Sequence, residues 1–298
     1  MDVEKELMPL SEGFPRPDWD AISKLVEAQP EQEWQVNWER WAKSWVAATA
    51  DCLPDGYKVI ESKNFLLLSS KDDHYLKLLN EFLERSLNKI LTALSGIASD
   101  DGYGKHVVFI FDEQDSYYRY KSYFYPDEGE FILSAGTFLN TGYGHFAFPY
   151  MDMDEAEATS AHELTHACLA HLPIPLWLNE GLAVTMESSI CGWSPQNKFE
   201  RFPEHVHFWN TETIQEYWSG EAFNRGDEGS GLSYELAGWC VEALAKDYDS
   251  FIAFTNAASH EDAGEPAATD AYGFGLGVLL EQFFGGGDWS PKPSKWEN

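Results

Sequence analysis

Two hydrophobic patterns along the chain predict two kinds of secondary structure. Short apolar runs bounded by polar or glycine-containing turns predict strands. These runs cover residues 65–68, 107–111, 131–133 and 145–148. Apolar residues within 75–94 recur at helical spacing and predict a long amphipathic helix. After Pro149 the strand pattern fades and helical spacing dominates over 154–284, so the chain is expected to combine an α+β part with a mainly helical part.

A tryptophan-rich segment precedes these elements. Its four tryptophans follow one another at spacings of four, three and four: Trp34, Trp38, Trp41 and Trp45. This spacing places the rings on one face of a helix over 31–50, and we expect that face to pack in the core. We predict three parts, namely an N-terminal arm and helix (1–54), an α+β part (55–175) and a helical part (176–298).

Composition and charge limit the classes of partner. The chain has 298 residues, of which 44% are hydrophobic, and carries a formal net charge of -30. Such a charge repels nucleic acid and anionic membrane surfaces, so neither is an expected partner. Because the chain has no apolar run of about 18 residues and its first ten residues are acidic, a soluble cytoplasmic protein is expected. Oligomeric state is left open.

The central motif is HELTH at residues 162–166, in a segment without proline or glycine that predicts a helix. Residues four apart lie on one face of a helix, so His162 and His166 can bind one zinc ion at about 2.0 to 2.1 Å. Glu163 lies beside that face. It can reach a water molecule on the metal without being a ligand, as a general base requires.

A second helix is predicted shortly after the first. Pro173 and Pro175 end the first helix, and the sequence LWLNEGLA at 176–183 begins the next one. A short connection favours antiparallel packing, which would bring Glu180 back to the two histidines. Gly181 is expected to let these two helices approach. Two histidines and a carboxylate leave one position of a tetrahedral zinc for water, so one catalytic zinc per chain is expected.

Other arrangements of ligands fit the sequence less well. A third histidine six residues after His166 would fall on Leu172, which excludes the metzincin pattern. His171 would lie about 140° round the helix from His166, so it is expected at the surface or in packing.

The motifs AHELTH (161–166), LP (172–173) and WLNEGLA (177–183) together resemble the gluzincin zinc peptidases called peptidase MA-like. The resemblance covers about residues 57–285. It implies an α+β, zincin-like fold with a mixed sheet, an active-site helix and a mainly helical C-terminal subdomain. It also implies that a strand at the sheet edge holds an extended peptide above the metal. Residues 145–148 are the candidate for that strand, with an ordinary edge strand as the equal alternative.

The resemblance further implies hydrolysis of peptide or protein substrates. Zinc would lower the pKa of its bound water and polarise the carbonyl, while Glu163 takes the proton and delivers it to the leaving amine. The resemblance points to Tyr234 as the oxyanion-stabilising residue, and His205 and His207 are the alternatives. Many gluzincins carry an aspartate four residues after the glutamate ligand. That position is Val184 here, and Glu187 is either its substitute or a solvated helix residue.

Two other functions are compatible with the sequence. A zincin-like module could retain the metal and bind a peptide or protein without turnover, although the intact Glu163 argues against it. A structural metal site, or none, is the second alternative. Between endopeptidase and aminopeptidase, the absence of a motif for a free α-amino group favours endopeptidase.

Overall fold

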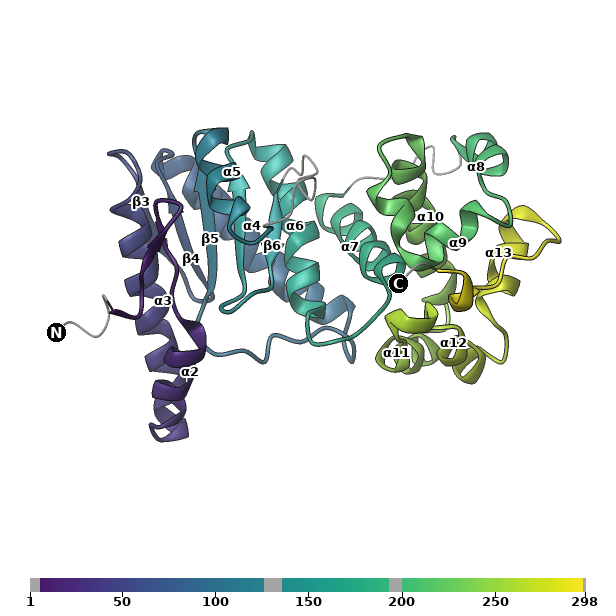
Figure 1. The fold of residues 1–298 in the computed structure, drawn as a ribbon, viewed down its shortest axis with the longest axis horizontal. Coiled ribbons are helices and arrows are strands. Elements are labelled where there is room, and N and C mark those ends of the chain that lie inside the picture. Colours follow the sequence, from purple (N-terminus) through teal and green to yellow (C-terminus); the bar gives the residue numbers. More distant parts are fainter. Residues whose placement is uncertain (1–5, 126–135, 193–199, 297–298) are drawn as a thin grey trace. The chain divides into compact units, whose positions relative to one another are not determined.

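The computed structural model describes residues 6–125, 136–192 and 200–296 (Figure 1). The chain forms two compact units. The first, here the sheet unit, comprises Met1–Lys89 and Asp100–Ala167. The second, here the helical unit, comprises Ile90–Ser99 and Cys168–Asn298. The predicted strand at 131–133 lies outside the described residues.

The sheet unit contains a mixed five-stranded sheet in the order β3-β4-β5-β7-β6. Its strands are β3 (Lys58–Glu61), β4 (Phe65–Ser69), β5 (His106–Phe111), β6 (Thr137–Leu139) and β7 (His145–Pro149). The inner strands β4, β5 and β7 are parallel, whereas β3 and β6 pair antiparallel at the two edges. The three predicted strands among the described residues are confirmed, and the fold is α+β.

The expected edge position of residues 145–148 is wrong. These residues form β7, which lies between β5 and β6, and the edge strand beside it is β6. The run HFAF is buried throughout, as is typical of an inner strand of a parallel sheet, which is covered on both faces. The three-residue strand β6 is too short to produce a recognisable pattern of its own.

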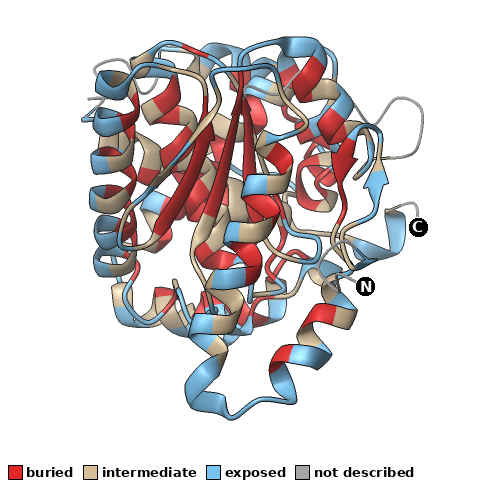
Figure 2. Ribbon diagram, turned by 90° about the vertical axis from the view of Figure 1, so that its left-hand side faces the viewer, coloured by how far each residue is buried: buried red, intermediate tan, exposed pale blue. Residues whose placement is uncertain are grey.

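Helices surround this sheet, and Figure 2 shows the strands buried while the outer sides of the helices are exposed. These helices are α2 (Trp19–Glu27), α3 (Trp34–Ala50), α4 (Asp73–Ala93), α5 (Gln114–Ser122) and α6 (Met153–Leu169). On the tryptophan face of α3, Trp41 and Trp45 lie in the core, as predicted. Trp34 and Trp38 are half-buried and pack against a small cluster formed with α2. Trp45 contacts the sheet, with its ring 5.0 Å from Phe109.

The helical unit contains no strand among its described residues, as predicted. Its helices are α7 (Leu176–Cys191), α8 (Phe202–Phe208), α9 (Thr213–Ser219), α10 (Glu228–Leu244), α11 (Tyr248–Ala257), α12 (Glu265–Tyr272) and α13 (Leu276–Phe284). Within residues 6–125, 136–192 and 200–296, no helix has both the length and the apolar character needed to cross a bilayer.

The packing of Gly181 differs from expectation. A Cβ atom at this position would lie 2.6 Å from the carbonyl oxygen of Ala237 and 2.7 Å from a methyl carbon of Val241. Both neighbours belong to α10, so the missing side chain allows α7 to approach α10. The sequence indicated a close approach correctly but assigned it to the wrong helix, because spacing along the chain does not identify a distant neighbour.

Candidate metal centre

The HELTH motif lies in helix α6, as predicted, and this helix ends at Leu169. The rings of His162 and His166 have centroids 4.7 Å apart and are inclined by 77°. Pro175 adopts an extended conformation immediately before α7 and accepts a hydrogen bond from the N–H of Leu178. The connection between the two helices is therefore only residues 170–175.

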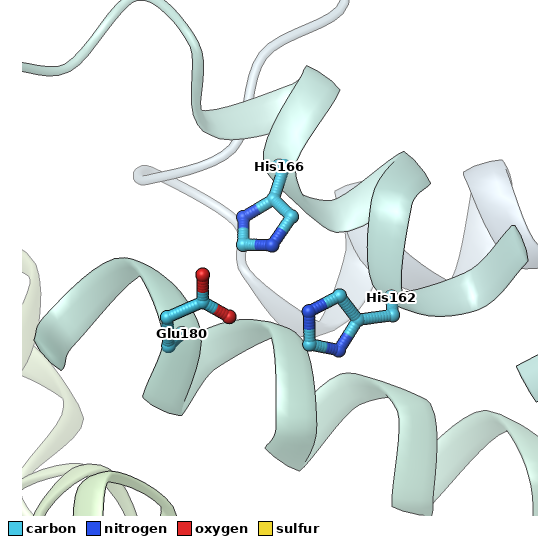
Figure 3. A group of neighbouring side chains, drawn as sticks. All are labelled: His162, His166 and Glu180. Atoms are coloured by element: carbon cyan, nitrogen blue, oxygen red, sulfur yellow. The ribbon is translucent and has the colours of Figure 1, made fainter. Parts of the chain in front are cut away.

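The structure brings the three predicted ligands together. Each of His162, His166 and Glu180 offers one ligand atom, and these atoms lie within 4.8 Å of one another. Figure 3 shows the two rings and the carboxylate facing one another. All three side chains are half-buried, and the described residues contain no other group of this kind.

The donor set fits zinc. Two imidazoles and a carboxylate are established ligands of catalytic zinc, and ligand atoms around a tetrahedral ion lie roughly 3.4 Å apart. Ligand atoms within 4.8 Å of one another are close to that spacing. Their role as ligands stays a prediction, now supported by their geometry.

Glu163 does not belong to the ligand group. Its Oε2 accepts a hydrogen bond from the main-chain N–H of Phe138 in β6, with an N–O distance of 2.6 Å. The buried Lys121 of α5 is also close enough for its charge to interact with Glu163. Burial lowers the pKa of Lys121, and the attraction of Glu163 opposes this effect. Neither contact was predicted, because a main-chain donor has no residue signature and Lys121 precedes Glu163 by 42 positions.

His205, one alternative for the oxyanion role, is a core residue. It is fully buried, its Nδ1 accepts a hydrogen bond from the Trp209 indole at 3.1 Å, and its Nε2 lies 3.1 Å from a carboxylate oxygen of Glu235. Burial lowers the pKa of His205, which favours the neutral ring. Both ring nitrogens are thus used inside the protein. His207, the other alternative, is exposed on α8.

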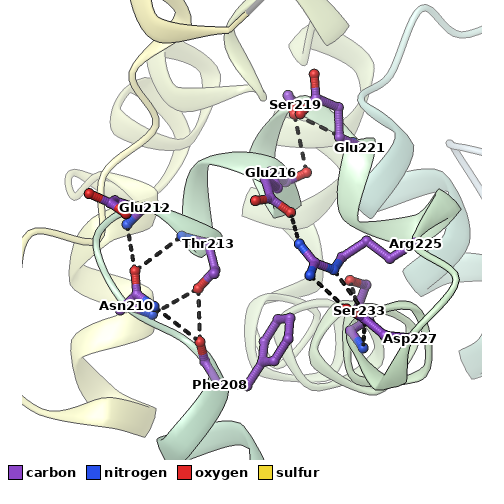
Figure 4. Close-up of polar contacts among 11 residues, drawn as sticks. Phe208, Asn210, Glu212, Thr213, Glu216, Ser219, Glu221, Arg225, Asp227 and Ser233 are labelled. Atoms are coloured by element: carbon purple, nitrogen blue, oxygen red, sulfur yellow. Dashed lines mark hydrogen bonds and ion pairs between the residues drawn. The ribbon is translucent and has the colours of Figure 1, made fainter.

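Tyr234 lies half-buried on α10, with its ring edge-on to Phe223 at 5.2 Å. The start of α10 is fixed by a polar network (Figure 4). Asp227 caps the helix by accepting a hydrogen bond from the N–H of Gly229 at 2.9 Å. Arg225 binds both oxygens of Asp227 and also pairs with Glu216 of α9. The oxyanion role of Tyr234 stays a prediction.

Two further residues of the predicted site region have clear positions. His171 is exposed just after α6, in agreement with a surface residue. Glu187 is half-buried on α7, and its part in orienting a metal ligand stays a prediction.

Comparison with known proteins gave no relatives. No protein-family model matches the chain, and no curated protein or solved structure gives a significant match. Any function assigned to this protein therefore depends on the geometry of the residues described above.

Proposed function

We propose that this protein is a zincin-like, zinc-dependent peptidase. The observation that carries the proposal is the group formed by His162, His166 and Glu180, whose ligand atoms lie within 4.8 Å. Structural zinc sites are closed by four protein ligands, whereas catalytic sites use three and keep one position for water or substrate. The three-ligand set supports the catalytic type.

Zinc, when bound, would act as a Lewis acid and lower the pKa of a coordinated water. Glu163, next to the first histidine in sequence, accepts a proton from the attacking water and returns it to the leaving amine nitrogen. The edge strand β6, whose Phe138 contacts Glu163, is the new candidate for holding an extended peptide. The net charge of -30 favours peptides without strong negative charge.

The test compares the zinc-loaded native protein with Glu163→Gln on an unfolded protein substrate, with and without a chelator. We expect the variant to lose at least about 10³-fold in turnover, because it removes the proton acceptor, while zinc stays near one per chain. Glu155→Gln, at an exposed position of the same helix, is the matched control and should keep both activity and zinc.

Three outcomes would change the proposal. Retained turnover in Glu163→Gln would remove Glu163 from its role. A native protein that binds no zinc would remove the metal centre. A zinc-loaded native protein that binds peptide and leaves it uncut would support the non-catalytic binding module.

A further inference from the structure

We propose that the main-chain N–H of Phe138 positions the carboxylate of Glu163 for proton transfer. This inference rests on the proposed peptidase function and assigns a role to strand β6 in it. The contact is a hydrogen bond to a carboxylate with an N–O distance of 2.6 Å. Hydrogen bonds to ionised groups are shorter and stronger than neutral ones, so the contact can fix a side chain.

The pairing of β6 explains why this N–H is available to Glu163. Phe138 lies opposite Phe146 in the antiparallel pair of β6 and β7. In such a pair, successive residues direct their N–H and C=O groups alternately toward the partner strand and away from it. Because the Phe138 N–H reaches Glu163, Thr137 and Leu139 are the residues that bond to β7. Phe138 therefore directs its main-chain groups away from the sheet.

Gly136 allows β6 to lie against the helix that carries Glu163. A Cβ atom at position 136 would lie 2.8 Å from Cγ2 of Thr159 and 2.2 Å from Cδ1 of Phe148. Thr159 precedes Glu163 by four residues, so both lie on one face of α6, one turn apart. The missing side chain of Gly136 thus permits the close approach that the hydrogen bond of Phe138 requires.

Lys121 supplies a second attraction to the same carboxylate. Its side chain, on α5, is 4% exposed, and its charge interacts favourably with that of Glu163. A buried cation is weakly screened by solvent, so its attraction adds to the hydrogen bond from Phe138. The two groups come from different elements and both restrain Glu163.

The restraint matters because a general base acts through its orientation. The hydrogen bond to Oε2 restrains the position of that oxygen and so limits the directions in which Oε1 can point. Proton transfer requires heavy atoms about 2.6 to 3.2 Å apart, and a small misplacement of a catalytic group lowers the rate strongly. Phe138 is therefore a positioning residue, which acts on the reaction through Glu163.

The test replaces Phe138 by L-phenyllactate, which exchanges the main-chain N–H for an ester oxygen and keeps the side chain. The matched control replaces Val108, in the inner strand β5, by its α-hydroxy acid, which removes a hydrogen bond of the sheet and leaves the contact with Glu163. We expect kcat to fall about tenfold for the change at position 138, with KM within about twofold and one zinc per chain. The control should change kcat by less than about twofold. Equal losses in both proteins would overturn the proposal.

A second measurement needs neither zinc nor activity. In the metal-free protein, exchange of the Phe138 amide hydrogen is followed by NMR. We expect Glu163→Ala to accelerate this exchange at least about tenfold and Glu155→Gln to leave it unchanged. Unchanged exchange in Glu163→Ala would overturn the positioning role. Failure of the native protein to cut peptides would overturn the proposed function, and the exchange result would still report on the contact.

Discussion

The histidines of α6 and the histidines inside the two units occupy different environments. His162 and His166 are half-buried and grouped with a carboxylate oxygen of Glu180. His145 is buried in the sheet unit, with Nε2 2.7 Å from the Tyr120 hydroxyl and Nδ1 2.8 Å from a main-chain carbonyl oxygen. His205 is buried in the helical unit and uses both nitrogens in the same way.

The difference separates a metal-binding role from a packing role. A ligand histidine must direct a nitrogen lone pair at the metal, beside other ligands that converge on the same point. A core histidine directs both nitrogens at protein partners, which satisfies its polar atoms in an apolar environment. Substitutions at the first kind should therefore change metal binding, and substitutions at the second kind should change stability.

The largest effect is expected for His166→Ala. Removal of one of three ligands should weaken zinc binding at least about 10³-fold, or about 4 kcal/mol, because two ligands hold zinc poorly. The free energy of unfolding of the metal-free variant should lie within about 1 kcal/mol of that of the metal-free native protein, since the ring is half-buried. Competition with a chromogenic chelator measures the affinity, and an unchanged value would exclude His166 as a ligand.

His205→Ala tests the role of a core histidine in stability. It leaves Trp209 and Glu235 without their common partner and creates a cavity, so the free energy of unfolding should fall by about 3 kcal/mol. Zinc binding should be unchanged. Urea denaturation of the metal-free protein measures the loss, and His207→Ala, exposed on the same helix, should cost less than about 0.5 kcal/mol. If His205→Ala lost zinc binding and kept its normal stability, His205 would be a metal ligand and not a core residue.

Gly181→Ala tests what holds the helix that carries Glu180. The new Cβ would lie 2.6 Å from the carbonyl oxygen of Ala237, so overpacking should cost about 2 kcal/mol of unfolding free energy. Gly238→Ala is the matched control on α10, because its Cβ would lie 3.7 Å from Val184. The control should be neutral or stabilise by up to about 1 kcal/mol. Equal stability of both variants would contradict the close approach of α7 and α10.

A pH-dependent effect is expected for His145. Burial lowers its pKa to about 3, below the ordinary value of about 6.5 in an unfolded chain. Between these values the unfolded chain binds the extra proton, so this residue's contribution to stability is complete above about pH 6.5 and is lost as pH falls toward 3. The single-group slope is about 1.4 kcal/mol per pH unit.

The measurement compares unfolding free energies of the metal-free native protein and His145→Phe between about pH 4 and 6. The variant keeps a ring among the aromatic neighbours of His145 and has no titrating group. Its stability should therefore depend less steeply on pH. Parallel curves for the two proteins would show that His145 does not titrate as inferred.

Local patterns of residues were enough to predict most of the helices and strands and the HELTH motif. Continuous apolar runs marked β4, β5 and β7, and helical spacing marked α3, α4, α6 and α7. These features depend on neighbouring residues and on the periods of helix and strand, which are visible in any sequence. The juxtaposition of Glu180 with the two histidines was also predicted, because a short connection between helices restricts their arrangement.

The contacts between distant segments could be seen only in the folded structure. It placed β6 rather than β7 at the sheet edge, packed Gly181 against α10, and gave Glu163 a partner in the main chain of Phe138. Strand order and helix packing are set by the burial of side chains from the whole chain, and no local pattern records them. A main-chain N–H is the same in nearly every residue, so its role depends on position alone.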